Sequence, residues 1–501
     1  MKNIMTLLGT GYYGEDVLNK TPWINKLSKN QNVFIVSRID PIIHINKQLT
    51  KLLSKEITIQ IKNNIKTLKE KTKKFSIIYN SAFMNRNYSE KEIQESQKWL
   101  GVSFSYMASF DRSFFDKSNN KDIRNKIILN NYITGLVSFF SHEFIENDIS
   151  HFVNTLEDEI FSVVAYFVAK KLRISIIGMV SGRFPKKGIM FCDNYEDVIL
   201  WNTDKHTDMN EIKELYNKNK IVNHENINKR QKNYSIFNIK DKIKGLLYIV
   251  NYKKYRNLLI MKLKYEQLIY KKTSLINEIY EHVNKIWRRH IIKIIIKKPE
   301  NEPFVLFPLH YEDDAQLTFR EPLINQYEMI MQISRCLPYG HYLYVKPHPH
   351  FIGTDVSFFK MLFLSNIKNV KIINPTYPTY PLINKAKLII TINATTGFEA
   401  LIFNRKLITL GHDFYCKSKI STRIDDINNM SEIITKLLNS ENIEKNSLTT
   451  KFIHNVFSNM IWTENIILSN GIYTYGEKDS SKISNVLNII ISKDPDQLNT
   501  A

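Results

Sequence analysis

The sequence predicts an α/β fold in which two Rossmann-like domains face a cleft and are joined by a basic helical connector. Its 501 residues exceed the roughly 150 expected of one domain. Strand-like apolar runs alternate with helix-like runs before residue 200 and after residue 300. Between these halves the alternation is absent. We therefore expect a first domain at 1–200, a connector or insertion at 201–300, and a second domain with a helical tail at 301–501.

Composition excludes several classes of protein. Hydrophobic residues form 43% and charged residues 24% of the chain, unlike a disordered or fibrous protein. The three scattered cysteines cannot form a disulfide framework or a CxxC metal site, so we expect a reducing compartment. The apolar run near the N-terminus is too short for a signal peptide, and no run is long enough for a membrane-spanning helix. A cytoplasmic location follows as the expectation.

The first half contains two βαβ-like patterns. The expected elements are a strand at 3–8, a glycine loop at 9–14, a helix at 17–29, a strand at 33–37, a strand at 151–154, a helix at 159–172 and a strand at 174–180.

The connector holds most of the positive charge. It has 23 Lys and Arg against 10 Asp and Glu, which is more than half of the net charge of +21. Clustered cations attract nucleic acids and anionic membranes. A/T-rich codons, which favour Ile, Asn and Lys together, would produce the same excess without any partner. Both interpretations remain open at this point.

The second half resumes the alternation. The expected strands are at 304–310, 342–349, 370–375, 388–394 and 407–411, with a helix at 321–338 and a helical tail from about 431. Two Rossmann-like halves separated by a connector are the outline of the GT-B glycosyltransferase architecture. In open α/β sheets the ligand lies beyond the carboxyl ends of the strands, so the loops after those strands are the candidate site.

The first glycine loop formally matches a dinucleotide fingerprint. Gly9, Gly11 and Gly14 follow a strand and precede a helix, and Asp40 follows the second strand. The same glycines also suit a loop that lets the backbone approach a ligand across a cleft, or a plain tight turn. We assign Gly9 and Gly11 to the cleft or acceptor side and expect no nicotinamide cofactor.

Two loops of the second half suit a nucleotide. Lys346, His348 and Pro349 belong to a proline-stiffened loop after a strand, which is alternatively a rigid turn with an exposed histidine. A second loop leads into a helix whose first turn is suited to phosphate. It contributes Thr395, Thr396, Gly397 and Glu399. The alternative there is a capping box of Thr396 with Glu399.

These loops, the stretch FPLHYEDDAQLT before them and LITLGHDFY after them resemble the capsule polysaccharide biosynthesis family over about 301–416. The resemblance implies a GT-B enzyme that uses a nucleotide-activated sugar such as CMP-Kdo, with His348 and Pro349 in the nucleotide site and Thr396, Gly397 and Glu399 as its other wall. His310 stands where the family usually has glutamine, and we include it among the donor-binding residues. The family's acidic-Gly-Tyr/Phe-x-Arg motif is absent from the first half.

Candidate catalytic and acceptor residues lie in the first half. Glu157 or Asp158, after the strand at 151–154, could act as nucleophile or base, or Asp158 could close a capping box with Thr155. Arg183 follows the next strand and could bind an acceptor phosphate or a sugar carboxylate, or be a surface arginine. We expect no metal at Glu312, Asp313 and Asp314, because GT-B enzymes stabilise the leaving phosphate with side chains and helix dipoles.

The expected function is a cytoplasmic, metal-independent glycosyltransferase that needs no cofactor. Its substrates would be a nucleotide sugar and a glycolipid or polysaccharide acceptor. The basic, apolar stretch at 285–298 suits peripheral contact with an anionic membrane or a core element flanked by lysines, and no nucleic-acid-binding module is recognisable. Two other functions remain open: a non-catalytic export-associated or scaffold protein, and transfer of glycerophosphate from a CDP-linked donor.

Overall fold

The computed structural model describes most of both halves of the chain. The described residues are 1–8, 22–37, 75–79, 86–110, 123–155, 160–182, 188–202, 208–214, 294–311, 314–321, 323–348, 358–417, 419–440, 447–463, 466–469, 472–493 and 500. The basic connector lies almost entirely outside them.

The first domain is built on a sheet with the order β14-β6-β5-β4-β1-β2-β3, and β7 pairs with β6. Five neighbouring strands are parallel. They are β1 (Asn3–Leu8), β2 (Asn32–Ser37), β3 (Phe75–Tyr79), β4 (His151–Thr155) and β5 (Ser175–Ser181). The strands β6 (Gly188–Asp193) and β14 (Ile461–Trp462) extend the edge in antiparallel fashion. The two-residue strand β7 is Asp197–Val198. The order β3-β2-β1-β4-β5 is that of a Rossmann sheet.

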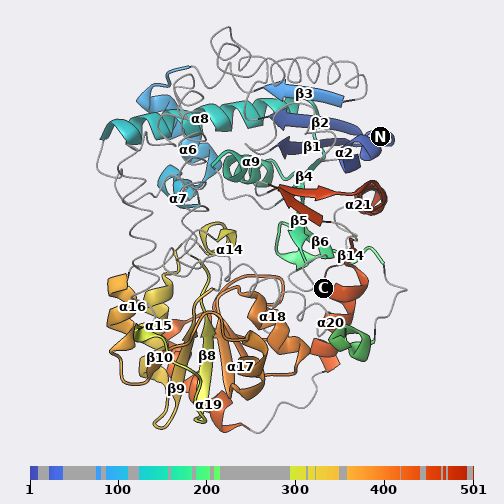
Figure 1. The fold of residues 1–501 in the computed structure, drawn as a ribbon. Coiled ribbons are helices and arrows are strands. Elements are labelled where there is room, and N and C mark those ends of the chain that lie inside the picture. Colours follow the sequence, from blue (N-terminus) through green and yellow to red (C-terminus); the bar gives the residue numbers. More distant parts are fainter. Residues whose placement is uncertain are drawn as a thin grey trace, which may run out of the picture.

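Helices cover both faces of this sheet (Figure 1). One face carries α6 (Glu90–Leu100), α7 (Phe104–Ser109), α8 (Ile123–Glu146) and α9 (Ile160–Lys171). The other carries α2 (Pro22–Leu27) and α21 (Glu477–Ser492). Successive residues of a strand point to opposite faces. Accordingly Met5 of β1 joins the core with α8 and α9, whereas Ile4 joins the core with α2 and α21.

The C-terminal segment is not the helical tail that the sequence predicts. It returns to the first domain and adds a strand to the first sheet. After α19 (Met430–Asn439) and α20 (Ser447–Ser458) it forms β14 on the first sheet, then a hairpin of β15 (Ile466–Ser469) and β16 (Ile472–Tyr475), then α21. The physical reason is the apolar face of α21, which packs with Trp23 and Leu27 of α2. The Gln31 side chain also donates to Asn488 at 3.1 Å.

The second domain has a six-stranded, fully parallel sheet in the order β10-β9-β8-β11-β12-β13. Its strands are β8 (Phe304–Pro308), β9 (Tyr342–Lys346), β10 (Val370–Ile372), β11 (Leu388–Thr391), β12 (Leu407–Thr409) and β13 (Thr422–Arg423). Counted from β8, this is the order 3-2-1-4-5-6 of the Rossmann fold. The sequence reverses direction across the sheet between β8 and β11, which is where such sheets bind ligands.

Five helices connect these strands. They are α14 (Ala315–Thr318), α15 (Gln326–Cys336), α16 (Phe358–Ser365), α17 (Thr379–Lys385) and α18 (Thr395–Ile402). The helix expected at 321–338 begins later because Asn325 is its N-cap, accepting from the backbone N–H of Tyr327. A short 3₁₀ turn, η3 (Ile427–Asn429), precedes α19. The predicted α/β fold class with two Rossmann-like domains is confirmed by the two separate sheets.

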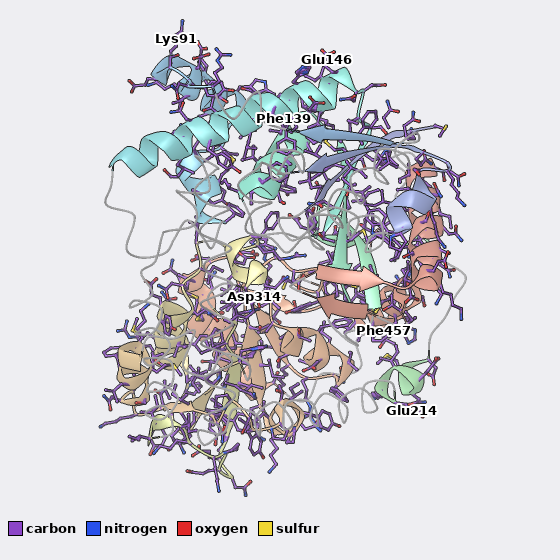
Figure 2. The ribbon with its side chains drawn as sticks, turned by 45° about the horizontal axis from the view of Figure 1, so that its top comes forward. Lys91, Phe139, Glu146, Glu214, Asp314 and Phe457 are labelled. Atoms are coloured by element: carbon purple, nitrogen blue, oxygen red, sulfur yellow. The ribbon has the colours of Figure 1, made fainter. Side chains whose placement is uncertain are left out.

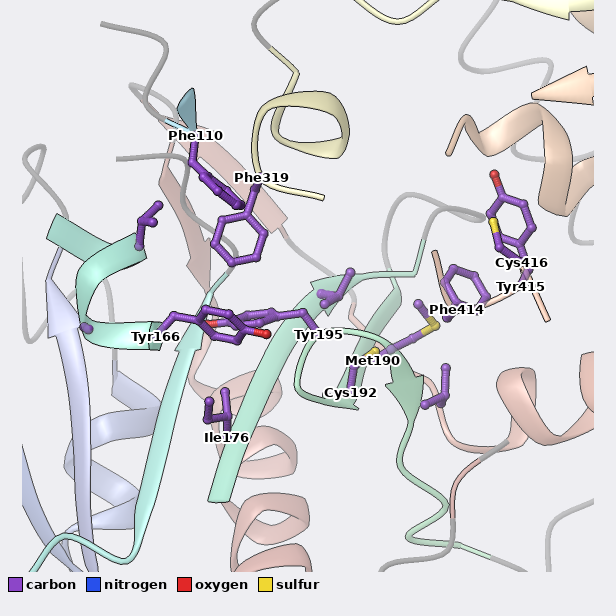
Figure 3. Close-up of a cluster of buried hydrophobic side chains, with 14 of the residues drawn as sticks. Phe110, Tyr166, Ile176, Met190, Cys192, Tyr195, Phe319, Phe414, Tyr415 and Cys416 are labelled. Atoms are coloured by element: carbon purple, nitrogen blue, oxygen red, sulfur yellow. The ribbon is translucent and has the colours of Figure 1, made fainter. Parts of the chain in front are cut away.

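An aromatic cluster joins the two domains (Figure 3). Phe319, just after α14 of the second domain, packs edge-on against Phe110, Tyr166 and Tyr195 of the first, with ring centroids 5.4–5.7 Å apart. Such edge-to-face pairs add about 0.5–1.5 kcal/mol each beyond the area they bury. The domains therefore share one continuous hydrophobic core.

Among the helices in the described residues, none combines the length and apolar composition needed to cross a bilayer.

A buried histidine should make stability depend on pH. His151, 2% exposed in β4, has its pKa lowered to about 4 by burial and, secondarily, by Lys2. The folded protein keeps this imidazole neutral, whereas the unfolded chain protonates it below about pH 6.5. Stability contributed by the neutral form is therefore present above pH 6.5 and is lost as the pH falls towards 4, by up to about 3 kcal/mol.

Urea unfolding of the parent and of His151→Gln at several pH values measures this effect. The parent should lose more stability than the variant between pH 6.5 and 4. Parallel pH profiles for the two proteins would contradict the assignment.

Candidate functional site

The candidate site lies at the carboxyl edge of the second sheet. The strands β8 and β11 are neighbours, and the loops that follow them carry His310 and the start of α18. The strand β9, on the other side of β8, ends at Lys346. Three of the predicted loops therefore leave the sheet side by side. Figure 2 shows Asp314, in the loop after β8, on the side of the second domain that faces the first.

His310 is held on all sides by the protein. It is 5% exposed, and the Gln326 side chain accepts from its backbone N–H at 2.8 Å and donates to its carbonyl at 3.2 Å. The backbone N–H of Asn393 donates to Nε2 at 3.3 Å, and Nδ1 lies 3.1 Å from Oδ2 of Asp314. Since Nε2 accepts, this pattern assigns the proton to Nδ1. The hydrogen bond between His310 and Asn393 thus connects the loop after β8 to the loop after β11.

Asn393 connects several loops at this edge through hydrogen bonds. It was not among the residues predicted from the sequence. Its side chain is fully buried, donates to the carbonyl of Gln316 at 3.1 Å and accepts from the backbone N–H of Asp413 at 3.1 Å. One amide therefore ties α14, the loop after β11 and the loop after β12 together. A Cβ at Gly411 would lie 2.2 Å from Oδ1 of Asn393, so only glycine allows this approach. The signal available in the sequence was an asparagine two residues after the buried strand β11.

The start of α18 differs from the expected capping box. The N-cap is Ala394, and its backbone N–H is satisfied by Oγ1 of Thr391 at 3.0 Å. Thr396 lies inside the first turn, so the capping box of Thr396 with Glu399 is wrong. Thr395, Thr396 and Gly397 do form the first turn of the helix, where the helix dipole is positive. The backbone N–H of Gly397 donates to the carbonyl of Ala394 at 2.9 Å, so the N–H groups of Thr395 and Thr396 are the ones placed for a ligand. That arrangement suits an anion such as phosphate.

Lys346 is a buried cation at the end of β9. It is 4% exposed, and Nζ donates to the carbonyl of Pro375 at 3.0 Å. Burial lowers the pKa of Lys346 to about 8, and the charge of Glu399 on α18 acts in the opposite direction. Lys346 and Glu399, both predicted donor-binding residues, therefore interact electrostatically across the gap between β9 and α18.

His348 lies at the rim of the same edge. It is half-buried, and its ring packs edge-on to Tyr311 with centroids 6.0 Å apart, so the loops after β9 and β8 are in contact. Pro349, also predicted for the donor site, lies outside the described residues.

A second polar network, absent from the sequence predictions, bridges the domains. Arg320 is almost fully buried, pairs with the buried Asp413 at 3.3 Å and donates to the carbonyl of Tyr195 in the first domain. Next to it, Glu321 accepts from the backbone N–H and Nδ1 of His412 at 2.5 and 2.8 Å. That hydrogen bond raises the pKa of His412. The network fixes the loop after β12 against the first domain.

The predicted residues of the first domain all lie outside the described residues. They are Gly9, Gly11, Glu157, Asp158 and Arg183. Their assignments stay predictions, but the strands before them are informative. In the sequence these residues come after β1, β4 and β5, which are adjacent and parallel, so the three strands end at one edge of the sheet. The neighbours β1 and β4 flank the point where the strand order reverses, as β8 and β11 do in the second domain.

No cluster of three or more potential metal ligands occurs within the described part of the chain. Of the acidic stretch after β8, Asp314 is described, and its carboxylate is engaged by Nδ1 of His310 and the backbone N–H of Gln316. Glu312 and Asp313 lie outside the described residues.

The family described as "Capsule polysaccharide biosynthesis protein" matches residues 210–427. The resemblance expected for the C-terminal half is therefore confirmed, and the match also takes in the connector. It includes His310, Lys346, His348, Thr395 and Asn393, the residues that meet at the carboxyl edge of the second sheet.

Individual relatives are distant. Protein FixF of Sinorhizobium fredii is 27% identical over 137 residues, which is 26% of this chain and 31% of FixF, so the match spans under a third of that relative. The solved structure of Thermosulfurimonas dismutans KpsC, a beta Kdo 2,7 transferase, is 14% identical over 70% of this chain and 89% of its own, with a TM-score of 0.30. Methanocaldococcus jannaschii UDP-GlcNAc 2-epimerase is 15% identical over 97% of this chain and 99% of its own, with a TM-score of 0.27.

The close packing around α18 yields a stability prediction. A Cβ at Gly397 would lie 2.7 Å from Cγ2 of Thr391 and 2.7 Å from Cε2 of Tyr415. Overpacking of this kind costs about 1–3 kcal/mol, and the better helix propensity of alanine returns about 1 kcal/mol. We expect Gly397→Ala to lower the free energy of unfolding by up to about 2 kcal/mol in urea titrations.

Thr391→Ser is the matched control, since it removes Cγ2 but keeps the hydroxyl that accepts from Ala394. In the double variant part of the lost stability should return. A Gly397→Ala protein as stable as the parent would show that the helix start can shift freely.

Proposed function

We propose that the chain is a GT-B glycosyltransferase that transfers a sugar from a nucleotide-activated donor to a polysaccharide or glycolipid acceptor in capsule or surface polysaccharide biosynthesis. The family match over 210–427 supports the biosynthetic role. The observation that carries the proposal is a buried lysine, Lys346, beside the start of α18, at the point where the second sheet reverses its strand order. A cation and the backbone N–H groups of Thr395 and Thr396 at a helix N-terminus together suit a donor phosphate.

The proposed reaction uses both domains. The second domain would hold the donor, CMP-Kdo or a similar nucleotide sugar, through Lys346, His348, Pro349 and the first turn of α18. The first domain would hold the acceptor near Gly9, Gly11 and Arg183. The acceptor hydroxyl attacks the anomeric carbon, the bond from that carbon to the phosphate oxygen breaks, and the nucleotide leaves as an anion. Glu157 or Asp158 would take the hydroxyl proton.

The leaving phosphate needs stabilisation as its charge develops. Lys346 and the N-terminus of α18 would supply it electrostatically, so the proposed chemistry is metal-independent. The pKa of about 8 for Lys346 keeps the amine mostly protonated at neutral pH. We further propose a cytoplasmic protein that touches an anionic membrane through the basic connector, because a lipid-linked acceptor would be presented there.

A donor screen tests the function directly. The purified full chain is incubated with CMP-, UDP-, GDP- and CDP-linked donors, and release of free nucleotide is followed with and without added glycolipid or polysaccharide acceptor. Turnover of one nucleotide sugar supports the proposal. Turnover of CDP-glycerol alone would identify a glycerophosphotransferase, and no turnover or binding of any donor would favour a non-catalytic scaffold.

His348 gives a first prediction for the donor site. If its imidazole bonds the donor nucleotide, His348→Ala should weaken donor binding by roughly 1.5–3 kcal/mol, the range for hydrogen bonds to charged groups. Calorimetric titration with the donor from the screen measures this, and a melting curve checks that the variant folds. Unchanged affinity in a folded variant would remove His348 from the site.

Glu399 gives a second prediction. Because Ala394 rather than Thr396 caps α18, Glu399→Gln should not weaken a helix cap. If Glu399 accepts a hydrogen bond from a donor hydroxyl, the variant should lose about 1.5–3 kcal/mol of donor affinity while its melting temperature changes little. A parallel loss of stability and affinity would instead assign Glu399 to neutralising the buried Lys346.

A further inference from the structure

One flank of the second domain combines exposed apolar side chains with lysines. The edge strand β10 is bordered by two segments: Lys297 pairs with Ile373 directly after β10, and α16 packs on β10 (Figure 1). Ile295 of the first segment and Met361 of α16 belong to the same core cluster. The segment 294–298 and α16 therefore line the same flank, which we call the β10 flank.

The apolar side chains on the β10 flank point away from the core. Ile294 is 77% exposed, Phe363 is 60% exposed and Leu362 is 37% exposed. Single exposed apolar residues are common on soluble proteins, but a group of them on one flank marks an interaction surface. The inward residues of α16, Met361 and Leu364, are each 1% exposed, so α16 is already anchored without Leu362 and Phe363.

The charge of the β10 flank is net positive. Lys297, Lys360 and Lys368 are exposed, and neither 285–299 nor 358–373 contains an Asp or Glu. The acidic residues that follow, Glu300 and Glu302, pair with Lys371 at 2.8 and 2.6 Å. Lys371 offsets one of these two negative charges, and with Lys297, Lys360 and Lys368 the flank keeps a net positive charge.

We propose that the β10 flank binds the surface of an anionic lipid bilayer, with Phe363 and Leu362 entering the interface and the lysines contacting lipid phosphates. This inference rests on the membrane contact proposed above and names a surface for it. A flank with a net positive charge is not complementary to itself, so a second copy of the chain would bring like charges together. An anionic leaflet offers what both kinds of side chain need: phosphate for the lysines and acyl chain for the phenylalanine and leucine.

The test separates the apolar contribution from the charge. The full chain is mixed with vesicles of phosphatidylcholine alone or with phosphatidylglycerol, and partitioning is measured by co-sedimentation at low and high salt. Leu362→Ser/Phe363→Ser keeps every lysine, and Ile145→Ser on α8, where Ile145 is 61% exposed, is the matched control. A connector variant replaces six residues by glutamine: Lys285, Arg288, Arg289, Lys293, Lys297 and Lys298.

The parent should bind the anionic vesicles, and the double variant should bind at least tenfold more weakly at both salt concentrations, while Ile145→Ser binds like the parent. The connector variant should lose mainly the salt-sensitive part of the binding. Equal binding by the parent and the double variant would overturn the inference, as would a parent that binds no vesicles. A parent dimer that the double variant abolishes would assign the flank to self-association.

Activity on a soluble acceptor keeps this test apart from the proposed function. The double variant should turn over the nucleotide sugar as the parent does, because Leu362 and Phe363 are outside the candidate site. Vesicle binding without any transferase activity would support the membrane-binding flank and reject the proposed glycosyltransferase function. Transferase activity without vesicle binding would support the function and reject the flank.

Discussion

The buried ion pair of Arg320 with Asp413 is the constraint on which the arrangement of the two domains depends. Arg320 also donates to the carbonyl of Tyr195, so one guanidinium joins the loops of the second sheet to the first domain. Removing one partner of a buried pair commonly costs about 3–5 kcal/mol, because a charge is left without compensation. Phe319, the preceding residue, enters the aromatic cluster with Tyr166 and Tyr195. Charge and packing therefore fix the same junction, next to the edge where the donor residues meet.

Asn393 connects the domain junction to the candidate site through hydrogen bonds. Its amide holds Asp413, the partner of Arg320, and its backbone N–H bonds His310 at the end of β8. Ala394, the next residue, caps α18, so the position of the helix start is coupled to the domain junction through two adjacent residues. The family resemblance predicts that His310 binds the donor nucleotide. In the structure both of its ring nitrogens have partners within the protein. Its clearest role is to hold the two central strands in register at their ends.

Local pattern was sufficient to predict the α/β class, the strands β1, β2, β4, β5 and β8–β12, and the helix α9, because each is a continuous apolar run bounded by turn residues. The return of the chain to the first sheet was not predictable, since the partner of α21 is α2, more than 400 residues earlier in the sequence. Arg320 and Asp413 escaped prediction for the same reason: nothing local distinguishes a buried arginine from a solvated one. The capping box at Thr396 is wrong because the N-cap is Ala394, two residues earlier than the local sequence favours.

The electrostatics at the carboxyl edge of the second sheet explain why an anion would complete it. Burial of the Lys346 amine opposes its charge, and the adjacent helix N-terminus adds positive potential. The negative charge of Glu399 favours the protonated amine, but burial outweighs it, since the pKa of Lys346 is still lowered to about 8. A bound phosphate would favour the protonated amine, and the same interaction would strengthen as negative charge grows on a leaving nucleotide. Under the proposed function, this residual positive potential would hold the leaving group more tightly than the intact donor, which is the differential binding that accelerates a transfer reaction.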